Sequence, residues 1–147
     1  MDQSFLHAKI LKHYENTENL ASDVLEVLPF LRENPLHIFP YKFVQKYKKE
    51  DIIVNYDKLK DLRFVLHNEE RLYFKRRMSP HAIKSLYLGL QLDQDNDSPH
   101  RYLNEDFKVE ARDVVIDAGA AEGNFSLNVV KQAQKVVLFE CDEDWIE

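Results

Sequence analysis

The sequence contains few of the residues that most strongly restrict how a chain folds and where it works. Cys141 is the only cysteine among 147 residues, which excludes an internal disulfide and is consistent with a reducing compartment. No apolar run is long enough for a signal peptide or a membrane span. We therefore expect a cytoplasmic protein that has no membrane partner.

Glycine is equally scarce, and two of the three glycines, Gly119 and Gly123, lie four positions apart. The P-loop pattern G-x-x-x-x-G-K-[ST] is absent. The dinucleotide pattern G-x-G-x-x-G also fails, because its central glycine is replaced by Ala121. Glu122 would place negative charge near a pyrophosphate. These absences disfavour a nucleotide-dependent oxidoreductase that uses NAD or FAD.

What the chain does contain is ordinary for a globular protein: 44% hydrophobic and 31% charged residues, enough for one modest domain. The net charge of −6 is uneven, with +6 over residues 41–84 and −9 over residues 85–147. The basic middle segment could contact nucleic acid. A solvated surface explains it more simply, so we expect no nucleic-acid partner.

Apolar residues at helical spacing predict two helices near the N-terminus, over residues 4–14 and from about residue 20 onward. Thr17 or Ser22 could cap the second helix. Pro29 interrupts its pattern, so we expect this helix to kink or end near Leu28.

Further patterns predict a helical turn at 41–47, a short strand at 52–54, a hairpin of strands 62–67 and 71–74, and a helix from 80 to about 92. The hairpin turn, Asn68-Glu69-Glu70, lacks the usual glycine. The Ser79-Pro80 pair is typical of a helix start, with a cap followed by proline at the first helical position.

The C-terminal part predicts a strand at 113–118, a helix at about 123–133 and a second strand at 135–140. Both strands are nearly continuous apolar runs, as in parallel sheets that are buried on both faces. We therefore predict an α/β fold in two parts. Residues 1–103 form a helical and β-hairpin extension, and residues 104–147 form the first βαβ unit of a Rossmann-like domain.

The turn between these strands has the spacing D-x-G-x-x-x-G, and an acid ends the second strand. Gly119 can supply a tight turn, and Gly123 can let a ligand approach the helix start. The N–H groups there favour an anionic group. Asp117 can attract a cation, and Glu140 can accept ribose hydroxyls. This layout indicates a nucleoside-cofactor site.

The segments VVIDAGAAEGNFSL (114–127) and VVLFECDEDW (136–145) resemble the start of the FkbM-like methyltransferases. Residues 63–103 are similar to the N-terminal extension of bacterial members. The resemblance implies a Rossmann-like fold and S-adenosylmethionine (SAM) as methyl donor. It also implies O-methyl transfer to a small-molecule or glycan acceptor, such as a hydroxyl of a sugar, glycan or secondary metabolite.

The resemblance assigns the cofactor loop to Asp117, Gly119, Ala121, Gly123, Asn124 and Phe125, and the ribose acid to Glu140. Many members carry Asn where Ala121 or Glu122 stands, so one loop contact differs. His100, Arg101 and Tyr102 are either part of the cofactor mouth or a structural connection. The histidines show no metal-ligand spacing, so we expect no metal site.

The catalytic and acceptor-binding residues of such enzymes would lie beyond Glu147, so no catalytic residue can be assigned. We expect this chain alone to lack activity, as an N-terminal portion of such an enzyme. The alternative is a non-enzymatic binding or interaction module, or a degenerate remnant of such an enzyme. In either case, an unpaired edge of the 113–118 strand predicts self-association, as a homo-oligomer or aggregate, through residues 113–140.

Overall fold

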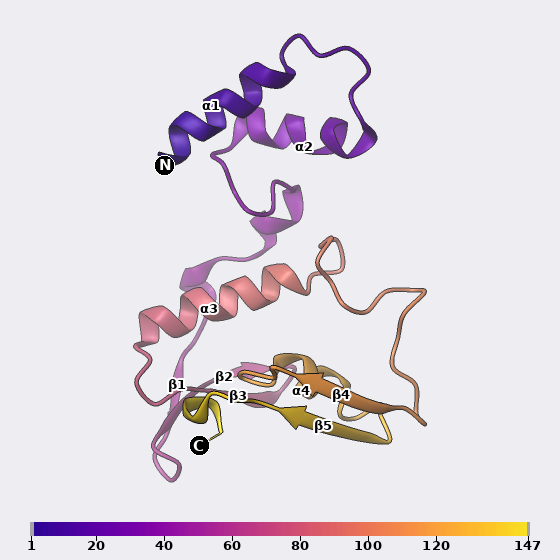
Figure 1. Cartoon of the computed structure of the whole chain (residues 1–147). Helices are drawn as coiled ribbons and strands as arrows, with labels where there is room; N and C mark the ends of the chain where they lie inside the picture. The colour runs from indigo at the N-terminus through magenta and orange to yellow at the C-terminus, as the bar shows by residue number, and fades with distance from the viewer. Residues whose placement is uncertain (1, 147) are drawn as a thin grey trace. The chain divides into compact units, whose positions relative to one another are not determined.

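The computed structural model describes residues 2–146 and divides into two compact units, one up to Lys46 and one from Tyr47 onward (Figure 1). The boundary expected near residues 103–112 therefore falls inside the second unit. A shared core explains this. Val65, Ile83 and Tyr87 are buried in one cluster, and Leu127 and Trp145 pack against it from the C-terminal part. No helix within residues 2–146 is long and apolar enough to cross a membrane.

The first unit contains helices α1 (Gln3–Tyr14) and α2 (Ser22–Glu33) and the short 3-10 helix η1 (Lys42–Lys46). The expected helix 4–14 is confirmed, but two details of the second helix are wrong. Its N-cap position is Ala21, and Thr17 instead donates to the carbonyl oxygen of His13 at 2.8 Å. The helix also does not end near Leu28 but continues through Pro29 to Glu33, so the expectation of an end there is wrong. Proline has no backbone N–H, so one hydrogen bond of the helix is missing at this position. Burial of neighbouring side chains, such as Phe30, offsets this loss and stabilises the last turn of the helix.

The second unit begins with η2 (Lys49–Asp51), β1 (Asn55–Asp57), β2 (Leu62–His67), β3 (Glu70–Phe74) and α3 (Pro80–Asp93). The three strands form an antiparallel sheet in the order β1-β2-β3. The hairpin and the Ser79-capped helix are confirmed. The strand expected at 52–54 is wrong by three residues, since Ile52 is instead the C-cap of η2 and donates to the carbonyl oxygen of Lys49.

The C-terminal part consists of β4 (Val114–Ala118), α4 (Asn124–Val129), β5 (Lys135–Phe139) and η3 (Glu143–Trp145). Strands β4 and β5 are parallel, with Val114 opposite Lys135, so the predicted strand–helix–strand order is confirmed. Helix α4 is shorter than expected. The chain after Val129 forms turns, and the N–H groups of Gln134 and Lys135 then donate to the carbonyl oxygen of Asp113. The molecule is mixed α/β.

Burial of β4 and β5 on both faces, in contrast, is wrong for this sheet. Val114, Ile116 and Phe139 are exposed, and β4 alternates between exposed and half-buried positions. The two strands form a two-stranded sheet within residues 2–146. Their continuous apolar character therefore leaves one face of this sheet apolar and uncovered.

Candidate functional site

The loop between β4 and α4 adopts an unusual backbone. Gly119, Ala121 and Gly123 have φ angles of 78°, 47° and 74°, all in the left-handed region. The N–H groups of Gly119 and Ala120 donate to the carbonyl oxygen of Phe139 at 2.7 and 3.1 Å. The loop therefore curls over the end of β5. This geometry explains why the scarce glycines gather here.

Gly119 and Gly123 are favoured because their backbone is left-handed, and not because a larger side chain would clash with its neighbours. A Cβ atom on Gly119 would meet nothing within 4 Å, and one on Gly123 would meet only a side-chain atom of Leu138 at 3.6 Å. Left-handed backbone costs L-residues about 1–2 kcal/mol, which glycine avoids. Ala121 bears this cost in the middle of the loop. Asn at this position would tolerate the left-handed conformation better than Ala.

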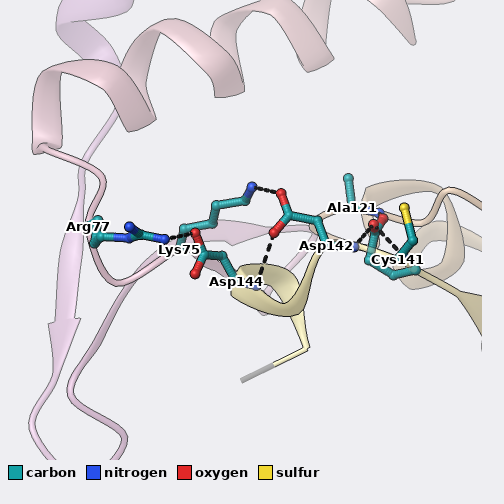
Figure 2. A network of polar contacts seen from close by, with 7 residues as sticks. Lys75, Arg77, Ala121, Cys141, Asp142 and Asp144 are labelled. Carbon is teal, nitrogen blue, oxygen red and sulfur yellow. Dashed lines mark hydrogen bonds and ion pairs between the residues drawn. The ribbon is translucent and has the colours of Figure 1, made fainter.

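Glu140, at the tip of β5, holds this loop in place. Its Oε2 accepts a hydrogen bond from the Ala121 N–H at 2.7 Å, and its Oε1 accepts from the N–H groups of Cys141 and Asp142, each at 2.7 Å (Figure 2). The N–H groups of Asp142 and Ala121 lower the pKa of the Glu140 carboxyl. Because a carboxylate has about four acceptor positions, these bonds leave about one for a ligand.

A chain of polar contacts continues from Glu140 to the end of the hairpin (Figure 2). The carboxylate of Asp142 pairs with Lys75, and that of Asp144 pairs with Arg77. Lys75 also lies over the ring of Trp145, 4.6 Å from its centroid. Sequence reasoning missed these residues, because each ion pair joins positions 67 apart. The contacts attach η3, and with it the end of β5, to the 75–77 segment.

Three carboxylates gather at the loop. Asp117 accepts a hydrogen bond from the Ser126 hydroxyl at 2.7 Å. Burial raises the pKa of the Glu122 carboxyl, and the neighbouring charges of Asp117 and Glu140 raise it further. The site therefore has a negative potential that favours a cationic ligand. Ser126 was also missed, although it is a polar residue in the predicted helix only nine positions after Asp117, which is a usable local signal.

Asn124, at the start of α4, has an unsatisfied buried oxygen. Its side chain is 5% exposed, and its Oδ1 has no hydrogen-bond partner within residues 2–146. A buried acceptor without a donor is unfavourable by about 1–3 kcal/mol. A ligand N–H or O–H that reached Asn124 would remove this cost. This observation is independent of the glycine spacing.

Two of the predicted site residues, Gly123 and Phe125, line different pockets. Gly123, together with Glu122 and Ser126, lines a pocket of about 340 Å³ against β3, β5 and Trp145. Phe125 instead lines a second pocket, of about 440 Å³, beside α3. Its ring makes an edge contact with Tyr102 at 5.6 Å between centroids. The structure therefore brings Glu140 to the loop through its bond to Ala121, while Phe125 lines a different pocket from Gly123.

The side chains of residues 100–102 also have different surroundings. His100 contacts the Asp93 carboxylate at 3.3 Å, whereas Arg101 lines the second pocket. No group of three metal-ligating side chains is found in the described part of the chain. No family model, curated protein or solved structure matches the chain.

Proposed function

We propose that the chain belongs to a SAM-dependent methyltransferase with a Rossmann-like fold, similar to the FkbM family, that methylates a hydroxyl of a sugar, glycan or secondary metabolite. The observation that carries the proposal is the β4–α4–β5 unit, with Gly119 and Gly123 left-handed and Glu140 bonded to Ala121. When bound, SAM would supply a sulfonium methyl group for the acceptor oxygen, and the products would be the methyl ether, S-adenosylhomocysteine and the proton lost from the acceptor hydroxyl.

The residues present fit this cofactor at two points. SAM carries an ammonium and a sulfonium group, and the carboxylates of Asp117, Glu122 and Glu140 favour cations. The unpaired Oδ1 of Asn124 is an acceptor that an ammonium could satisfy. Glu140 fits less well as a ribose acid, because about one acceptor position remains for two hydroxyls.

This partial fit favours one alternative, a non-enzymatic binding or interaction module. In that case Glu140 serves only to hold the loop, through the bonds from Ala121, Cys141 and Asp142. The two functions differ in one measurable property. The methyltransferase binds SAM, and a module that retains only the loop architecture does not.

Isothermal titration calorimetry with SAM, S-adenosylhomocysteine and NAD tests the proposal. We expect SAM and S-adenosylhomocysteine to bind and NAD not to bind. The Asn124→Leu variant should bind SAM about tenfold more weakly, because it loses one hydrogen bond to a charged group. The same variant should unfold at higher urea concentration, since it removes a buried unpaired oxygen.

A variant that binds SAM more weakly but is more stable than the wild type has lost a ligand contact and has not misfolded. If the wild type binds none of the three ligands, the methyltransferase proposal fails and the interaction module becomes the better interpretation. If SAM binds equally well to wild type and Asn124→Leu, the role given to the Asn124 oxygen is wrong.

A further inference from the structure

The second pocket, called here the α3–α4 pocket, is chemically unlike the glycine loop. It is enclosed by the hairpin turn, α3, the 94–103 segment and α4, and its volume is about 440 Å³, a size typical of small-molecule sites. None of its lining residues is Asp or Glu. Carboxamide side chains from several elements line it, among them Gln91, Asn96 and Asn128.

Arg101 is the only Lys or Arg residue among those that line this pocket. Its guanidinium contacts the neutral carboxamide oxygen of Asn96, and it forms no ion pair with a carboxylate within residues 2–146. A guanidinium has five N–H donors in a planar fork that matches a carboxylate. The exposed Arg101 therefore offers an unneutralised charge and several remaining donors to a ligand in the pocket.

Hydrogen bonds fix Asn128 so that it adds further donors. The Oδ1 atom of Asn128 lies 2.6 Å from Nε2 of His67 and accepts from Nδ2 of Asn68 at 2.8 Å. The Nδ1 atom of His67 lies 3.0 Å from the Tyr87 hydroxyl. Because two donors already occupy the Asn128 oxygen, what Asn128 can still offer a ligand is its amide N–H groups.

The remaining walls are apolar or aromatic. Leu90, Leu103 and the rings of Tyr87 and Phe125 line the same pocket. Aromatic and aliphatic walls favour an apolar aromatic ring, while the guanidinium and amide N–H groups favour an anion. We propose that the α3–α4 pocket binds a small aromatic carboxylate, with its carboxylate on Arg101. This site is separate from the glycine loop and does not depend on SAM binding.

Benzoate is the probe, and neutral benzamide of nearly the same shape is its control. Amide chemical shifts in ¹⁵N-labelled protein should change on benzoate titration at Arg101, Phe125 and Asn128. The expected dissociation constant is about 1 mM or tighter, as for a fragment of this size. Benzamide should bind at least about tenfold more weakly, because it lacks the charge that Arg101 recognises.

The Arg101→Gln variant should weaken benzoate binding by at least about tenfold and leave benzamide binding unchanged. The Arg112→Gln variant is its matched control, since it removes the same charge from an exposed position that does not line the pocket. Equal affinity for benzoate and benzamide, no saturable binding, or shifts confined to other regions would each overturn the proposal. Each of these outcomes is measured on the wild-type protein, so the test does not depend on whether a variant folds. SAM titrations report on the glycine loop separately.

Discussion

Two glutamates of the glycine loop affect stability in opposite directions. The backbone N–H groups of Asp142 and Ala121 lower the pKa of Glu140, so its ionised form stabilises the fold. That contribution is present above the ordinary carboxyl pKa and is lost as the pH falls through the lowered value. Burial and neighbouring charges raise the pKa of Glu122, so its ionised form is unfavourable. The ionised carboxylate of Glu122 therefore lowers the stability of the folded state.

Replacing Glu122 by Gln should therefore stabilise the protein at neutral pH. We expect an increase in the free energy of unfolding of less than about 1 kcal/mol at pH 7, because the side chain is only partly buried. The gain should shrink as the pH falls through the raised pKa and vanish below the ordinary value of 4.5, where Glu122 is protonated in both states. Urea denaturation at several pH values measures this difference.

The Glu105→Gln variant is the control, because it makes the same charge change at an exposed position. A Glu122→Gln variant that is no more stable than Glu105→Gln at pH 7 would show that the charge on Glu122 is solvated in the folded state.

At the residue scale, the sequence predicts what is local. The tight turn at Gly119 and the position of Glu140 at the end of the second strand follow from spacing along one strand–turn–helix segment, and the structure confirms these two backbone features. Contacts between distant segments leave no such pattern. The pairing of Lys75 with Asp142, 67 positions apart, depends on how elements pack, which spacing does not encode.

The β2–β3 hairpin shows what an element tolerates when its turn residues are unfavourable. Asn68 and Glu69 both have positive φ angles, 50° and 70°, as in a two-residue turn that normally favours Asn-Gly. Asn is common in this conformation, whereas Glu is not. Cross-strand pairs such as Val65 and Leu72, both buried, hold the strands together despite this turn.

The Glu69→Gly variant should consequently stabilise the hairpin. We expect the free energy of unfolding to rise by about 1 kcal/mol, because glycine removes the left-handed penalty. The Glu70→Gly variant should instead lower it, since Glu70 begins strand β3 and pairs with Lys131 at 2.6 Å. Thermal or urea unfolding distinguishes the two. A less stable Glu69→Gly protein would contradict the turn conformation described here.

At the element scale, the start of α3 was predicted correctly, whereas the cap of α2 was not. Ser79 caps α3 as expected, because a cap depends on a few adjacent residues. The ends of α2 and α4 were wrong for reasons outside their own sequences. Buried neighbours carry α2 through Pro29, and the need to start β5 beside Val114 shortens α4. Tertiary packing therefore sets where α2 and α4 end.

At the scale of the whole molecule, the sequence could not show which surfaces are covered. A continuous apolar strand fits burial on both faces, yet Ile116 is 66% exposed in β4. Val114, Ala118 and Phe139 are exposed on the same sheet, and their register places them on the face of Ile116. Within residues 2–146, β4 pairs with β5 alone, so its other edge lacks a strand partner.

An apolar face beside an unpaired edge predicts self-association through β4. Sedimentation velocity of the wild-type chain should show mass that increases with concentration, and Ile116→Lys should shift it toward monomer by adding repulsive charge to the face. Leu59→Lys is the matched control, since Leu59 is 99% exposed and lies outside this sheet; it should associate like wild type. Neither variant should lose stability, as both positions are exposed. A wild type that stays monomeric at all concentrations, with slow amide exchange throughout β4, would show that the strand is protected without a second chain.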